Sequence, residues 1–85
     1  MTLKGTVRYI NHQRGMVAAL TEEGSYSVFE LLGGDAIEIG DSLSWQNDTS
    51  LGSETINNHT QSERYEVYFQ NHHILESQLR RQLLV

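Results

Sequence analysis

Short stretches in which apolar and polar residues alternate make up much of this chain, and glycine-containing turns separate them. Residues 2–10 show the pattern clearly, because Leu3, Val7 and Tyr9 alternate with charged or hydroxyl-bearing residues. Alternation at period two predicts a β-strand with one buried face. Gly5 within this strand predicts a bulge or a sharp bend. A chain divided in this way is expected to fold mainly as β-sheet.

Four further strands are predicted, at residues 16–20, 26–32, 43–45 and 64–69. The segment before the last of them, residues 46–62, has only Leu51 and Ile56 as hydrophobic residues. We expect a long loop there, with at most a weak hairpin around residues 54–56, and loops of this length are often functional or mobile. Five short strands with glycine at the corners predict a small Greek-key barrel over residues 1–70.

The period of the hydrophobic residues changes after residue 70. Three leucines then recur at every fourth position, which places them on one side of a helix: Leu75, Leu79 and Leu83. Arg80 and Arg81 fall near the C-terminal end of this helix, where the helix dipole favours positive charge. A leucine stripe rarely stays exposed to solvent. Residues 71–85 are therefore predicted to form a helix that packs on the barrel or makes a dimer contact.

Size and composition exclude several classes of protein. A chain of 85 residues forms one domain. It has no cysteine, which excludes disulfides, thiolate nucleophiles and thiolate metal sites. No run approaches the roughly 18 apolar residues of a membrane span, and the N-terminus has no apolar signal segment. We therefore expect a cytoplasmic protein with no membrane partner.

Charge is distributed unevenly along the chain, whose net charge is −5. Residues 1–20 carry three basic residues and no acidic one, whereas residues 21–62 carry eight acidic residues and no basic one. Binding to a phosphate backbone needs Lys and Arg on one face. The N-terminal cations predict at most a small nucleic-acid footprint, and the other interpretation is that both charged segments are solvated strand faces and loops.

The N-terminal segment is similar to a known family. Residues 4–11 read Lys-Gly-Thr-Val-Arg-Tyr-Ile-Asn and are followed by Arg14-Gly15-Met16, a pattern that resembles the opening of cold-shock domains. Residues 26–29 and 39–45 look like later strands of that family, less closely. The resemblance implies a five-stranded OB-type barrel that binds single-stranded RNA or DNA on an aromatic platform.

The residues that would bind nucleic acid follow from this resemblance. Tyr9 stands where family members stack bases on a tryptophan, whereas Met16 and Ala18 stand where they present two phenylalanines. Each stacked base is worth about 1–3 kcal/mol, so weak binding without strong sequence preference is expected. Tyr9 and Phe29 are each open to two interpretations, a stacking platform or a core residue, and for Phe29 the core is favoured. The candidate nucleic-acid-binding residues are Lys4, Arg8, Tyr9, Arg14, Met16 and Phe29.

A protein-interaction module on a degenerate OB barrel is the alternative function. Its contact surfaces would be the acidic segment and the leucine stripe (Leu75, Leu79 and Leu83), with a homodimer as the simplest case. Catalysis is not expected, since no Gly-x-Ser-x-Gly elbow is present. No cofactor is expected. No metal is expected either, because the four histidines lack the His-x-x-x-His and Glu-x-x-His spacings of metal sites.

Overall fold

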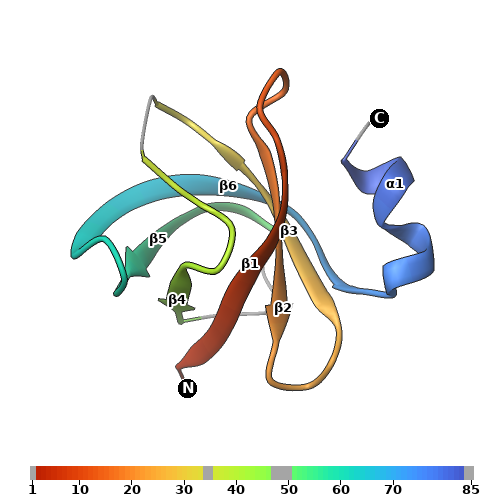
Figure 1. Cartoon of the computed structure of the whole chain (residues 1–85), viewed down its shortest axis with the longest axis horizontal. Coiled ribbons are helices and arrows are strands. Elements are labelled where there is room, and N and C mark those ends of the chain that lie inside the picture. Colours follow the sequence, from red (N-terminus) through yellow and green to blue (C-terminus); the bar gives the residue numbers. More distant parts are fainter. Residues whose placement is uncertain (1, 34–35, 47–50, 84–85) are drawn as a thin grey trace.

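A computed structural model describes residues 2–33, 36–46 and 51–83. In this part of the chain six strands close into a barrel, and a short helical segment follows the last of them (Figure 1). The elements are β1 (Leu3–Asn11), β2 (Met16–Thr21), β3 (Tyr26–Leu31), β4 (Ser42–Trp45), β5 (Gly52–Asn58), β6 (Glu63–Ile74), the 3-10 turn η1 (Glu76–Gln78) and α1 (Leu79–Gln82). Neither helical element is long and apolar enough to cross a membrane.

The prediction of a mainly β protein with a small barrel and a C-terminal helix is confirmed, but the predicted number of five strands is wrong. The additional strand is β5, which lies in the segment expected to be a loop. It forms a seven-residue antiparallel ladder with β6 and also pairs with β4. Only Ile56 and Asn58 of β5 are buried, so its sequence lacks the apolar alternation of a strand. Residues 47–50 of the expected loop lie outside the described residues.

The sixth strand changes how the barrel closes. The strand order is β1-β2-β3-β6-β5-β4, and β4 returns to pair with β1. All six ladders are antiparallel. A closed barrel with an odd number of strands must contain at least one parallel pair, because directions cannot alternate all the way round. With six strands the directions alternate all the way round, and β6 is antiparallel to its neighbour β3.

The barrel interior holds the main hydrophobic core. Phe69 of β6 is fully buried at its centre, with ring centroids 5.4 Å from Phe29 and 5.5 Å from Trp45. Tilted and edge-on ring contacts at such distances stabilise beyond the area that they bury. The cluster consists of Val7, Val17, Ala19, Phe29, Ile37, Leu43, Trp45, Ile56, Tyr65, Val67 and Phe69.

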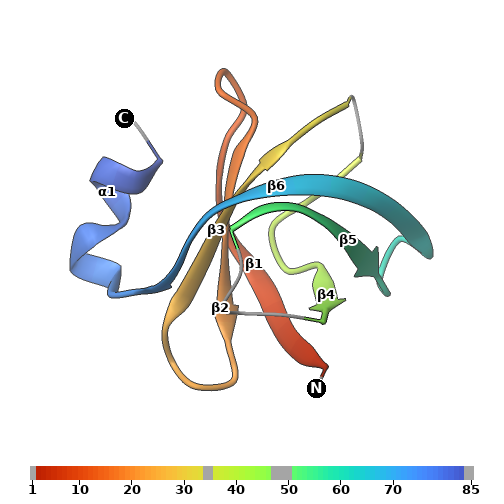
Figure 2. The same cartoon turned by 180° about the vertical axis from the view of Figure 1, so that it is seen from behind.

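A second hydrophobic cluster lies outside the barrel, where α1 covers β2 and β3. Both figures of the ribbon place α1 on the side away from β4 and β5 (Figures 1 and 2). The members of this cluster are Met16, Ala18, Tyr26, Val28, Ile74, Leu79 and Leu83. Strands β2 and β3 are therefore buried on both faces over four residues each. A continuous apolar run, as in residues 16–20, is typical of such strands.

The predicted leucine stripe is divided between the core and the surface. Leu79 and Leu83 pack on this chain's own barrel, whereas Leu75 is 60% exposed. The helix is shorter than predicted because β6 continues as far as Ile74, four residues beyond the predicted barrel boundary at residue 70. Residues 84–85 of the predicted helix lie outside the described residues.

The predicted bulge in the first strand exists, but at Arg8 instead of Gly5. Val7 pairs with Ala19 and Tyr9 with the next residue, Ala18, so Arg8 is the extra residue. Gly5 has a different role, since a Cβ built on it would lie 2.9 Å from the Trp45 ring. The glycine is needed because the buried indole approaches the β1 backbone closely.

Candidate functional site

The bulge at Arg8 places Tyr9 on the outer surface of the barrel. Val7 points into the core, and without the extra residue Tyr9 would share that side. Instead the Tyr9 side chain is 39% exposed, and its ring lies 5.9 Å from that of Tyr26. Of the two interpretations of Tyr9, a surface platform is the one that this geometry allows.

Tyr9 lines a shallow pocket between β1 and the C-terminal helical segment. The pocket has a volume of about 290 Å³. We call it the Tyr9 pocket, and its lining residues are Tyr9, Glu76, Leu79, Arg80 and Leu83. One aromatic ring and two leucines give it an apolar wall. The Arg80 guanidinium and the Glu76 carboxylate, which accepts a hydrogen bond from Tyr26, lie beside them. This combination suits a flat ring with a negative group attached.

Four of the six basic residues lie around α1 and the neighbouring Tyr9–Tyr26 pair. We call the surface formed by these four arginines and Tyr9 the arginine surface. Arg80 lines the Tyr9 pocket. Arg14, from the turn after β1, and Arg81 line a second pocket beside α1. Arg8 is close enough to Tyr26 for its positive charge to act on that hydroxyl. The members are Arg8, Tyr9, Arg14, Arg80 and Arg81.

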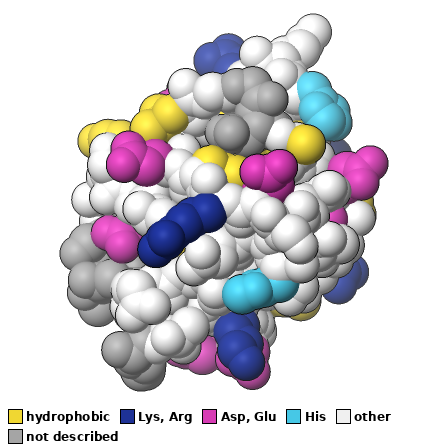
Figure 3. Space-filling model, turned by 90° about the vertical axis from the view of Figure 1, so that its left-hand side faces the viewer, with side chains coloured by type: hydrophobic (Ala, Val, Ile, Leu, Met, Phe, Trp, Pro, Cys, Tyr) yellow, Lys and Arg dark blue, Asp and Glu magenta, His cyan; other side chains and the backbone are white. Residues whose placement is uncertain are grey.

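The arginine surface has a local excess of positive charge within an acidic protein. The carboxylates that line its two pockets belong to Glu30 and Glu76. The face opposite α1 differs, since basic, acidic and hydrophobic side chains are interspersed there with no single basic patch among the side chains drawn in colour (Figure 3). Four arginines against these two carboxylates favour the attraction of an anionic ligand beside α1.

The structure brings together only some of the residues predicted to bind nucleic acid. Arg8, Tyr9 and Arg14 lie on the arginine surface. Met16 is 6% exposed beneath α1, and Phe29 is fully buried in the barrel core. Lys4 lines a separate pocket together with Thr21, Glu22 and Ser42, among others, and does not share a pocket with the arginines.

Arg80 and Arg81 are members of the arginine surface that sequence reasoning missed. Their charge had been explained by the helix dipole alone. The signal that points to them is their position directly after Leu79. Because Leu79 packs on the barrel, the two residues that follow it also lie close to the barrel surface.

A hydrogen bond beneath Tyr9 links β3 to the C-terminal segment. The Tyr26 hydroxyl donates to Glu76 Oε1 at 2.9 Å. Burial, and then the hydrogen bond to Glu76, raise the pKa of Tyr26 from 10.0 to about 12. The bond fixes the start of η1 over the second hydrophobic cluster.

The raised pKa of Tyr26 predicts that stability falls at high pH. The folded protein holds this proton more tightly than the unfolded chain, so the contribution is complete below pH 10 and is lost as the pH rises through about 12. Tyr26→Phe is expected to lower the free energy of unfolding by about 0.5–1.5 kcal/mol at pH 7 and to weaken the decline between pH 10 and 12. Urea unfolding across this range measures both effects. An equally steep decline in Tyr26→Phe would contradict the assignment.

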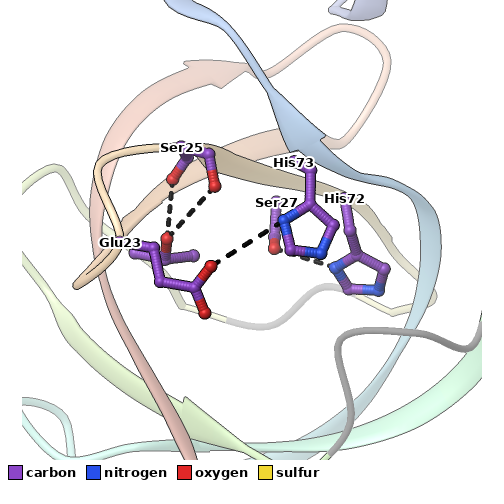
Figure 4. Close-up of polar contacts among 6 residues, drawn as sticks. Glu23, Ser25, Ser27, His72 and His73 are labelled. Atoms are coloured by element: carbon purple, nitrogen blue, oxygen red, sulfur yellow. Dashed lines mark hydrogen bonds and ion pairs between the residues drawn. The ribbon is translucent and has the colours of Figure 1, made fainter.

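His72 and His73 of β6 form polar contacts with Ser27 of β3 and with Glu23 of the β2–β3 turn (Figure 4). Ser27 Oγ and His72 Nδ1 share a hydrogen bond of 2.8 Å. His73 Nδ1 lies 4.0 Å from Glu23 Oε2, and both of these side chains are more than half exposed. The Ser27 hydroxyl is 1% exposed, so no substrate reaches it. This contact holds β6 to β3 and is not arranged for nucleophilic chemistry.

A buried carboxylate is satisfied by hydrogen bonds at the turns beside β4. Asp41 Oδ2 accepts from the Glu38 backbone N–H at 2.9 Å and from Asn58 Nδ2 at 2.8 Å. Gln61 Nε2 adds a third donor at 3.3 Å. A carboxylate with three donors serves to hold the turns together. Among the described residues no three His, Asp or Glu side chains are grouped to hold a metal ion.

The arginine surface is thus the part of the described chain where exposed charge, an aromatic ring and pockets coincide. Compared with protein-family models, with curated proteins and with solved structures, the chain matches none of them.

Proposed function

We propose that this protein is a small β-barrel module that binds single-stranded RNA or DNA weakly through the arginine surface. The observation that carries the proposal is that four of the six basic residues lie around α1 and the neighbouring Tyr9–Tyr26 pair, in a chain whose net charge is −5. A base stacks on Tyr9, and Arg80 binds the phosphate next to it. Arg8, Arg14 and Arg81 attract the rest of the strand.

Weak binding without strong sequence preference follows from the same geometry. On the arginine surface a base has the Tyr9 ring as its aromatic platform, because Met16 lies beneath α1 and Phe29 lies in the core. Stacking tolerates every base, since all bases have a π-face. The acidic remainder of the protein repels the strand outside the arginine surface.

A relationship to cold-shock domains is part of this proposal. The consecutive pairing of β1, β2 and β3 and the exposed aromatic residue at Tyr9 support it. The sixth strand and the helix over Met16 are departures from that family's pattern. The protein-interaction alternative loses two members of its leucine stripe, because Leu79 and Leu83 are buried within this chain.

Fluorescence anisotropy with a labelled oligouridine tests the proposal. With three or four phosphate contacts, raising the salt from 50 to 200 mM is expected to weaken binding about 20- to 50-fold. Tyr9→Ala is expected to weaken it by about 5- to 150-fold, the equivalent of one stacked base, whereas Tyr9→Phe keeps the ring and the affinity.

A matched pair of charge variants completes this test. Arg80→Gln removes a cation from the Tyr9 pocket and is expected to weaken binding, whereas Arg64→Gln removes one that lines a different pocket, beside β5. Equal losses in the two variants, or affinity that does not change with salt, would contradict the proposal.

A further inference from the structure

Arg14 and Arg81 line one pocket although they are 67 positions apart in the chain. Arg14 comes from the turn between β1 and β2, and Arg81 from α1. The pocket has a volume of about 300 Å³ and is lined by Arg14, Met16, Glu30, Gln70, Arg81 and Gln82. We call it the Arg14–Arg81 pocket. Two guanidinium groups, two side-chain amides and one carboxylate surround its single apolar side chain.

The side chain of Asn11 holds the two arginine-bearing segments together. Its Nδ2 donates to the Leu83 backbone oxygen at 2.8 Å, at the end of α1. Its Oδ1 accepts from the Arg14 backbone N–H at 3.4 Å, within the turn. Both arginines are therefore attached to segments whose relative position is fixed, a precondition for a built anion site.

The two amides of the pocket are also positioned by hydrogen bonds. Asn71 Nδ2 donates to Gln82 Oε1 at 3.4 Å, which occupies the acceptor end of that amide and leaves its NH₂ group as a donor. Gln70 Nε2 donates to Glu30 Oε1 at 3.3 Å. Among the described residues Glu30 is the one acidic side chain lining the pocket, and its charge opposes the two arginines.

We propose that the Arg14–Arg81 pocket binds a phosphate group, with the two guanidiniums as its main ligands and the Gln82 amide as an additional donor. Guanidinium groups match phosphate oxygens in charge and in geometry. This inference rests on the proposed function, in that the phosphate belongs to the strand whose base stacks on Tyr9. The carboxylate of Glu30 weakens the attraction and keeps the affinity low.

The pocket is tested with inorganic phosphate, uridine 5′-monophosphate and uridine, each added to ¹⁵N-labelled full-length protein at pH 7 and constant ionic strength. Both phosphate-bearing probes are expected to shift the resonances of Arg14, Gln70, Arg81 and Gln82, and uridine is not. Arg81→Gln is expected to weaken the binding of phosphate on the order of fivefold, whereas Arg64→Gln leaves it unchanged.

Glu30→Gln is expected to change the affinity for phosphate in the opposite direction to Arg81→Gln. Removing this negative charge is expected to tighten phosphate binding about two- to fivefold, and a loss of fold cannot imitate tighter binding. Weaker or unchanged binding in Glu30→Gln, or an absence of phosphate-induced shifts at Arg14 and Arg81, would overturn the assignment of the pocket.

The two proposals fail in distinguishable ways. If oligouridine binds through Tyr9 and Arg80 but Arg14→Gln and Arg81→Gln leave its affinity unchanged, the pocket holds no phosphate of the strand, and the proposed function remains with binding at the Tyr9 pocket. If inorganic phosphate binds at Arg14 and Arg81 but oligouridine does not bind, the pocket assignment holds and the proposed function is overturned.

Discussion

Replacing Phe69 by alanine is expected to lower the free energy of unfolding by about 3–5 kcal/mol, the range for a buried phenylalanine. The Phe69 ring touches three other rings, those of Phe29, Trp45 and His72, at centroid distances of 5.4, 5.5 and 4.7 Å. Its removal leaves a cavity at the point where β3, β4 and β6 meet. Small domains are stable by about 5–15 kcal/mol in total, so much of the stability is lost.

Tyr68→Ala is the matched control, because Tyr68 is the next residue before Phe69 on the same strand and its side chain is 44% exposed. Its cost is expected to be below about 1 kcal/mol. Urea unfolding followed by tryptophan fluorescence measures both variants. Similar losses for the two variants would show that the interior of the barrel is not organised around Phe69.

Leu79→Ala is expected to cost about 2–5 kcal/mol, because Leu79 is buried against β2 and β3 in the second hydrophobic cluster. Leu75→Ala is expected to cost less than about 0.5 kcal/mol, since that side chain is 60% exposed. Leu75 precedes η1 in extended backbone, whereas Leu79 begins α1. Alanine is a better helix former than leucine, so a loss in Leu79→Ala measures packing and not helix propensity.

Light scattering distinguishes this packing from a dimer contact. The structure predicts that both leucine variants have the same mass in solution as the parent protein, and that Leu79→Ala unfolds at lower urea concentration. A parent dimer that dissociates in Leu75→Ala or Leu79→Ala, with unchanged stability of the monomer, would contradict the intramolecular role of α1.

The strands that could be predicted from the sequence are those with a buried apolar face. Residues 65, 67 and 69 alternate so clearly that β6 was found, although its extension to Ile74 was not. Strand β5 was missed because Ile56 is its only buried hydrophobic residue. What holds β5 is its backbone pairing with β4 and β6, and pairing of backbone groups leaves little trace in side-chain chemistry.

The candidate site was only partly predictable for a different reason. The bulge at Arg8 reverses the direction of Tyr9, and one extra residue in a strand leaves the local sequence pattern looking regular. Met16 was expected on the surface because nothing local shows that α1 covers β2. The placement of Arg14 and Arg81 in the lining of one pocket depends on how the β1–β2 turn and α1 lie against each other, which no single segment encodes.

Binding of a single strand to the arginine surface is tested most directly by an NMR titration of the labelled protein with an eight-nucleotide RNA at two salt concentrations. We predict shifts that cluster on Tyr9, Arg14, Arg80 and Arg81 and become smaller at the higher salt concentration. An unchanged spectrum at millimolar RNA, or shifts confined to the face opposite α1, would contradict the account.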